Sequence, residues 1–135
     1  MVLNIHFTKA LVLVGILVLF GIILFNKRIQ HSRLEVFQKY SQIILPPDYE
    51  IKQNTAGAGN YKTNIVLVFQ FDPKNYEMFL LQNKINTAAL GGYEPGSWVK
   101  SGPVIFRERI FDAHTSLSEA IDTNQKMFEF HFKQK

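Results

Sequence analysis

The pattern of apolar and polar residues divides the chain into an unbroken apolar run near its start and a longer region of alternating segments. Residues 10–25 are apolar throughout. As a helix this run is about 24 Å long, whereas a bilayer core takes roughly 20 residues. Ile5, Phe7 and Ile29 lengthen the run if the ammonium group of Lys9 reaches the interface. We therefore expect one membrane-spanning helix.

The residues after this run distinguish a retained anchor from a cleavable signal. Signal peptidase requires small residues in an A-x-A-like pattern, but here the bulky Phe25 and the basic pair Lys27 and Arg28 follow. The run also lacks the polar face that a helix of a soluble protein normally carries. The sequence therefore predicts an uncleaved anchor within residues 1–28. Its expected lipid-facing residues are Ala10, Leu13, Gly15, Leu17, Phe20, Gly21, Leu24 and Phe25.

Residues 29–45 continue the helical pattern with an apolar stripe. The stripe residues lie three, four or seven positions apart or side by side. This spacing predicts an amphipathic helix that prolongs the membrane helix until Pro46 and Pro47 end it. A helix lying on the lipid headgroups is the alternative. The stripe consists of Ile29, Val36, Phe37, Tyr40, Ile43 and Ile44.

Residues 46–135 have the pattern of one small α+β domain. An N-cap followed by proline, Asp72 and Pro73, predicts a helix to about Asn86. A capping-box pattern at residues 116–119 predicts a second, short helix. Because few long crossovers are available, we expect an antiparallel sheet of about four strands with the helices on one face. Its strands are expected at residues 47–53, 65–71, 104–112 and 126–133.

Charge and composition limit the kinds of partner and site that the sequence predicts. The net charge of +4 comes from residues 1–39, because residues 40–135 carry ten basic and ten acidic side chains. Lys9, Lys27, Arg28 and Arg33 flank the apolar run, where they favour anionic headgroups. Nucleic-acid binders instead spread basic residues over a folded face, so no nucleic-acid partner is expected. The absence of cysteine excludes disulfides, thiolate metal sites and a cysteine nucleophile.

The orientation in the membrane is left open by the charge pattern. Basic residues after the span favour a cytoplasmic domain under the positive-inside rule. A short, positively charged N-terminal tail favours the opposite arrangement, with the domain outside the cytoplasm. The number of basic residues after the span, compared with those before it, weakly favours a cytoplasmic domain.

Four polar constellations resemble chemical sites, and each has a simpler structural interpretation. Gly57–Gly59 lacks the lysine and following helix of a phosphate loop. Asp112, His114 and Ser116 lie too close in sequence for a triad that converges from separate elements. Glu129 and His131 supply only two ligands for a metal. Glu108, flanked by Arg107 and Arg109, suits a sheet-face ion pair better than an anion or carboxylate contact. We therefore predict no catalytic, cofactor or metal site.

Exposed aromatic residues in a loop are the best candidates for partner binding. Tyr93 and Trp98 bracket a Pro-Gly turn, and Arg107 follows on the next expected strand. The sequence favours a membrane-anchored, non-catalytic accessory or interaction module, a small subunit of a larger membrane complex. A membrane-tethered sensor of a small ligand or peptide is the alternative, and a small hydrolytic enzyme is a third.

Overall fold

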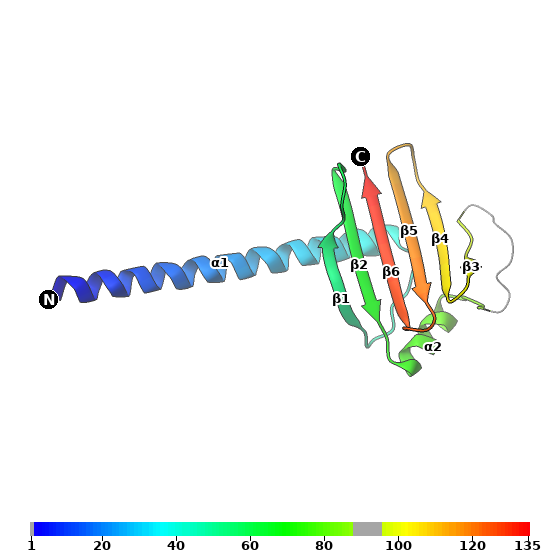
Figure 1. The fold of residues 1–135 in the computed structure, drawn as a ribbon, viewed down its shortest axis with the longest axis horizontal. Coiled ribbons are helices and arrows are strands. Elements are labelled where there is room, and N and C mark those ends of the chain that lie inside the picture. The colour runs from blue at the N-terminus through cyan, green and yellow to red at the C-terminus, as the bar shows by residue number, and fades with distance from the viewer. Residues whose placement is uncertain (1, 88–95) are drawn as a thin grey trace. The chain divides into compact units, whose positions relative to one another are not determined.

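The computed structural model describes residues 2–87 and 96–135, with side chains described from Thr8 onward. The chain forms two compact units, Met1–Glu35 and Val36–Lys135. Helix α1 (Val2–Tyr40) is one continuous α-helix, drawn in blue and cyan in Figure 1. A long apolar helix followed by a sheet domain with a short helix confirms the α+β class.

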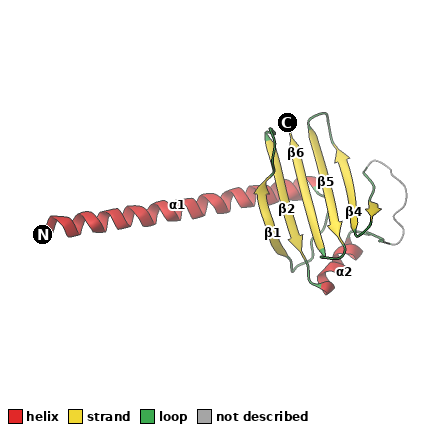
Figure 2. Cartoon of the chain, in the orientation of Figure 1, coloured by secondary structure: helices red, strands yellow, loops and turns green. Residues whose placement is uncertain are grey.

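The second unit is built on one antiparallel sheet of six strands, yellow in Figure 2. The order across the sheet is β1-β2-β6-β5-β4-β3. The prediction of about four strands is wrong, because the sequence pattern indicates neither β3 nor β5 as a strand. In chain order the strands are β1 (Glu50–Ala56), β2 (Thr63–Gln70), β3 (Val99–Ser101), β4 (Val104–Ile110), β5 (Thr115–Asp122) and β6 (Met127–Gln134).

The chain path places the last strand in the middle of the sheet. After β2, helix α2 (Pro73–Gln82) takes the chain toward β3 at the far edge, and β4 and β5 follow as neighbours. Strand β6 then inserts between β5 and β2 and pairs with both along its whole length. This central position, together with helix residues packed on one face, leaves Phe128, Phe130 and Phe132 at most 1% exposed, while Glu129 on the other face is exposed.

We call the sheet face that carries these three phenylalanines the inner face. Leu67 and Phe69 of β2 lie opposite Phe130 and Phe128 in the strand register, so they share this face. Leu117 and Ile121 of β5 and Ile105 of β4 extend it, and all of these side chains are buried. The inner face is therefore the apolar core of the domain.

Both helices contribute a phenylalanine to this core. The ring of Phe37, in the last turn of α1, lies 5.1 Å from the ring of Phe130 and 5.2 Å from that of Phe69. The ring of Phe79 of α2 lies 5.4 Å from that of Phe128. Since these partners all belong to the inner face, the end of α1 and α2 cover the same side of the sheet.

Helix α2 begins as the sequence predicts and ends earlier. Asp72 is its N-cap and accepts a 2.9 Å hydrogen bond from the backbone N–H of Asn75, which lowers the pKa of the Asp72 carboxyl. The helix ends at Gln82 instead of near Asn86. The side-chain amide of the next residue, Asn83, makes two hydrogen bonds to the backbone of Ile44. Its oxygen accepts from the N–H of Ile44 at 2.7 Å, and its nitrogen donates to the Ile44 carbonyl at 2.8 Å.

The short helix predicted from the capping-box pattern is wrong, because this segment is strand β5. Thr115, Leu117, Glu119 and Ile121 point to the inner face and are at most 4% exposed, while the residues between them are partly exposed. An alternation of period two is the pattern of a strand. Pairing with β4 on one side and β6 on the other outweighs the local capping preference.

Two boundaries differ from expectation. Helix α1 ends at Tyr40, whereas the pattern predicts helix as far as residue 45. Strand β1 runs over Glu50–Ala56 instead of 47–53 and contains an irregularity between Ile51 and Gln53. Strand β1 is an edge strand, and a bulge of this kind discourages further pairing along an edge.

Candidate functional site

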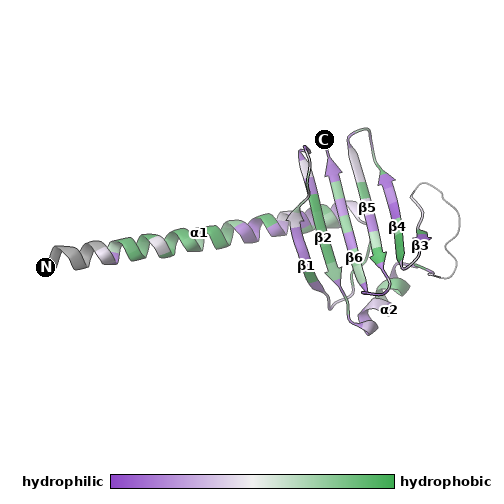
Figure 3. Ribbon diagram, in the orientation of Figure 1, coloured by the Kyte–Doolittle hydropathy of each residue, from purple (hydrophilic) through white to green (hydrophobic). Residues whose placement is uncertain are grey.

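The first candidate site is the apolar surface of α1 in the unit Met1–Glu35. Its side chains are exposed rather than packed: the large apolar residues from Leu11 to Phe25 are each 51–64% exposed. Figure 3 shows this stretch as a largely hydrophobic length of helix. The helix is long and apolar enough to span a membrane. Gly15 and Gly21 have no side chain within 4 Å that a Cβ would meet.

Basic residues stand on both sides of this apolar surface. Lys9 precedes it, and Lys27 and Arg28 follow it; all three are exposed, while Arg33 is partly buried. Residues 10–25 carry no charged side chain, and the basic residues lie just before and just after them. Such an arrangement matches a bilayer, whose apolar core is bounded by charged headgroups.

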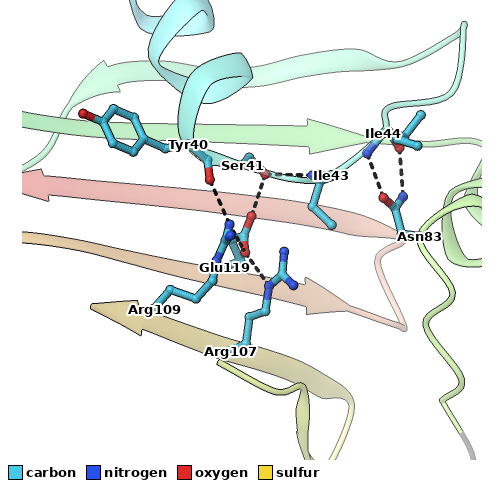
Figure 4. A network of polar contacts seen from close by, with 8 residues as sticks. All are labelled: Tyr40, Ser41, Ile43, Ile44, Asn83, Arg107, Arg109 and Glu119. Atoms are coloured by element: carbon cyan, nitrogen blue, oxygen red, sulfur yellow. Dashed lines mark hydrogen bonds and ion pairs between the residues drawn. The ribbon is translucent and has the colours of Figure 1, made fainter. Parts of the chain in front are cut away.

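The second candidate site is a charged cluster on the inner face of the sheet, shown in Figure 4. We define the Glu119 cluster as Glu119, Arg107, Arg109 and Ser41. The Glu119 side chain is 0% exposed, and those of Arg107 and Arg109 are 12% and 14% exposed. Fully buried acidic residues are rare unless they are paired, so each contact of this carboxylate matters.

Each oxygen of the Glu119 carboxylate has a partner. Oε2 accepts from Nε of Arg107 at 2.5 Å and from an Nη2 of Arg109 at 3.2 Å. Oε1 accepts a 2.6 Å hydrogen bond from the hydroxyl of Ser41. The register explains the arginine contacts, because Arg107 lies directly opposite Glu119 on β4 and Arg109 is the next inner-face residue.

The Glu119 cluster also ends helix α1. Nη2 of Arg109 donates a 3.0 Å hydrogen bond to the carbonyl of Tyr40, the last helical residue. The Ser41 hydroxyl, besides donating to Glu119, accepts from the N–H of Ile43. Carbonyls at a helix C-terminus lack partners and carry partial negative charge. The cluster therefore supplies a C-cap from the sheet.

Two guanidinium groups share one carboxylate in this cluster. Burial lowers the pKa of Arg109, and the Glu119 carboxylate opposes that shift. Two arginines and one glutamate leave the cluster with an excess positive charge, and Arg109 places part of it beside the negative C-terminal end of α1. Nη2 of Arg107 and Nε of Arg109 are buried and find no hydrogen-bond partner among the described residues. The cluster is thus rich in donors and short of acceptors.

Two of the three predicted partner-binding residues come together in the structure. The Arg107 guanidinium lies 4.4 Å from the centre of the Trp98 ring, in a cation–π contact. Trp98 precedes the edge strand β3 and is partly exposed. Tyr93 lies outside the described residues. Trp98 therefore connects the Glu119 cluster to the protein surface.

The remaining polar constellations have structural roles. Asp112 accepts the backbone N–H of His114 at 2.7 Å in the β4–β5 turn, and Gly57–Gly59 lies in the β1–β2 hairpin. His131 is within 3.0 Å of the side-chain oxygen of Asn64, on the face opposite the inner one. Among the described side chains, no three His, Asp or Glu residues gather as metal ligands.

Sequence reasoning does not identify Glu119 and Arg109 as a site. Within the capping-box interpretation Glu119 is a helix residue, and Arg109 is grouped with Glu108 in a sheet-face ion pair. The alternation of Thr115, Leu117, Glu119 and Ile121 is the signal that points to burial, because it places the carboxylate in an otherwise apolar row.

Comparison with known proteins adds no further assignment. No protein-family model, curated protein or solved structure matches this chain. The apolar helix and the Glu119 cluster are therefore the features of the chain that bear on its function.

Proposed function

We propose that the protein is a membrane-anchored, non-catalytic interaction module, in which α1 holds the sheet domain at a bilayer. One observation carries the proposal. Thirteen large apolar side chains between Leu11 and Phe25 are more than half exposed, and a surface of this size on a soluble monomer is unfavourable. At about 25 cal/mol per Å² of apolar area, lipid is the environment that stabilises it.

The proposal includes retention of the helix after membrane insertion. The residues at the end of the apolar run and after it, Phe25 to Arg28, lack the small side chains of a cleavage site. The domain that follows the anchor has a core of its own, because residues 36–135 form a separate compact unit. The domain then presents its surface to another membrane protein or complex.

Membrane retention is tested by extraction of membranes at alkaline pH and high salt, followed by N-terminal sequencing of the retained chain. We expect the intact chain in the membrane pellet. Leu13→Asp combined with Leu17→Asp should release it, because each central charge disfavours insertion by about 2.5–3.5 kcal/mol. Gln38→Asp combined with Gln42→Asp adds the same charge outside the run and should leave the chain in the pellet. A mature chain that begins after Arg28 would identify the run as a signal and refute the anchor.

The interaction role is tested separately, by purification in mild detergent at native expression level and chemical crosslinking. We expect a reproducible membrane partner. Recovery of the bare monomer alone would contradict this part of the proposal. Protease protection of the domain in sealed vesicles would decide its side of the membrane, for which the weak charge count favours the cytoplasm.

A membrane-tethered sensor of a small ligand is the second candidate function, favoured by the contact between Trp98 and Arg107. An aromatic ring beside a donor-rich guanidinium is a common way to recognise small polar molecules. Since Trp98 is the only tryptophan in the chain, its fluorescence reports directly on this place. A fluorescence response to none of a broad set of metabolites would contradict the sensor function.

A further inference from the structure

Arg107 is the charged residue of the Glu119 cluster with the least complete set of partners. Its Nε donates to Glu119 and its π face lies against Trp98. Its Nη2 is buried and makes no hydrogen bond to the described residues. A buried donor without an acceptor costs about 1–3 kcal/mol, and more when it is charged. The arrangement is therefore incomplete as a purely structural ion pair.

The neighbouring groups do not supply the missing acceptor. Both oxygens of Glu119 are already used, one by Ser41 and the other by the two arginines. Arg109 has a second acceptor in the carbonyl of Tyr40, whereas the described residues offer Arg107 no acceptor besides Glu119. One further negative oxygen at the Nη edge of Arg107 would satisfy this donor and balance the second guanidinium charge.

We propose that Arg107, beside Trp98, binds an oxyanion of a small molecule, a carboxylate or a phosphate. The planar fork of a guanidinium matches both groups through paired N–H···O bonds. Nη2 is almost closed to solvent, so the oxyanion reaches it when a covering group moves. The ring of Trp98 lies against one face of the guanidinium and is partly exposed, so its movement is one way to open this place. The inference rests on the sensor function and is independent of the membrane tether.

The test uses the full chain in micelles of an uncharged detergent. Trp98 fluorescence and the unfolding temperature are followed while sodium acetate or inorganic phosphate replaces chloride at constant ionic strength. We expect a saturable fluorescence change and a rise in unfolding temperature with at least one oxyanion, since a ligand of the folded state stabilises it. Acetate and phosphate in separate titrations distinguish the two sources of the oxyanion.

Matched variants connect the response to the fork of Arg107. Arg107→Lys keeps the charge but loses the planar fork, and we expect the apparent affinity to fall at least about tenfold. Lys62→Gln removes an exposed basic residue elsewhere and should leave the affinity unchanged. If Arg107→Lys does not fold, the wild-type chain decides: a saturable rise in unfolding temperature with an oxyanion supports the inference, and no rise, or one that only grows linearly with concentration as excluded salts produce, overturns it.

No saturable response to either oxyanion, or an unchanged affinity in Arg107→Lys, overturns the inference. A response of Trp98 to an uncharged or cationic metabolite, without one to acetate or phosphate, also overturns it but leaves the sensor function standing. These outcomes distinguish an error in the proposed ligand, an oxyanion, from an error in the proposed sensor function.

Discussion

The hydroxyl of Ser41 donates a 2.6 Å hydrogen bond to Glu119, a residue 78 positions later in the chain. This bond joins the first residue after helix α1 to the inner face of β5. Through Glu119 the same point is connected to Arg107 and Arg109. The end of the long helix and the centre of the sheet therefore share one buried polar cluster, and its removal has measurable consequences.

Glu119→Gln should destabilise the domain strongly. The change leaves two largely buried guanidinium groups without a carboxylate, and breaking a buried ion pair in this way costs about 3–5 kcal/mol. Urea unfolding of the full chain in uncharged micelles, followed by Trp98 fluorescence, measures the difference. Glu129→Gln changes an exposed acid on the neighbouring strand and should cost less than about 0.5 kcal/mol. Equal effects of the two variants would contradict a special role for Glu119.

Removal of all three charges should be much less harmful than removal of one. In the triple variant Arg107→Met, Arg109→Met and Glu119→Leu, no buried charge is left unpaired. Apolar replacements of such clusters are often neutral or stabilising. We expect the triple variant to be more stable than Glu119→Gln in the same urea experiment. A triple variant less stable than the single one would show that the charges themselves hold the end of α1.

Phe37→Ala should loosen the last turn of α1 from the sheet. The Phe37 side chain is 4% exposed and its ring contacts those of Phe69 and Phe130. Truncation of a buried phenylalanine typically costs about 3–5 kcal/mol. Phe25→Ala is the matched control, because Phe25 is 64% exposed, and it should leave urea unfolding of the domain unchanged. A similar loss in both variants would refute the separate core of the domain.

Tyr76→Phe should leave stability unchanged or raise it by about 1 kcal/mol. The Tyr76 hydroxyl is buried and has no hydrogen-bond partner among the described residues, and burial raises the pKa of this phenol. Removal of an unsatisfied buried hydroxyl relieves its desolvation cost. Thermal unfolding measures the change, with Tyr49→Phe at a 41% exposed site as the control. A loss above about 1 kcal/mol would show that the hydroxyl has a partner in solution.

His131 should make the domain less stable as the pH falls below about 6.5. Burial and the nearby Lys133 lower the pKa of His131 from its ordinary value of 6.5, with Glu129 opposing. The unfolded chain therefore takes up a proton at a higher pH than the folded chain, so acidification favours unfolding. His131→Gln should reduce the fall in unfolding temperature between about pH 7.5 and 5.5. His114→Gln, at an exposed site, should leave that fall intact; the same reduction in both variants would contradict the prediction.

The sequence by itself determined the elements whose patterns are local. An apolar run predicts a helix that can span a bilayer, whatever the fold of the rest of the chain. The reason is that the run contacts lipid and needs no other segment of the chain to pack against. Asp72 and Pro73 start α2 through hydrogen bonds and dihedral preferences within one turn. The alternation of Phe128, Phe130 and Phe132 predicts β6, since side chains of a strand change face at every residue.

Only the tertiary structure decided the features that depend on distant residues. Ser116–Glu119 satisfies a helix cap locally, yet two flanking strands make it part of β5. Helix α1 ends at Tyr40 because Arg109 binds the carbonyl of this last helical residue and Glu119 binds the hydroxyl of Ser41, the next residue. A buried carboxylate is stable only when its partners arrive from other strands, and no local pattern states which strands will be neighbours.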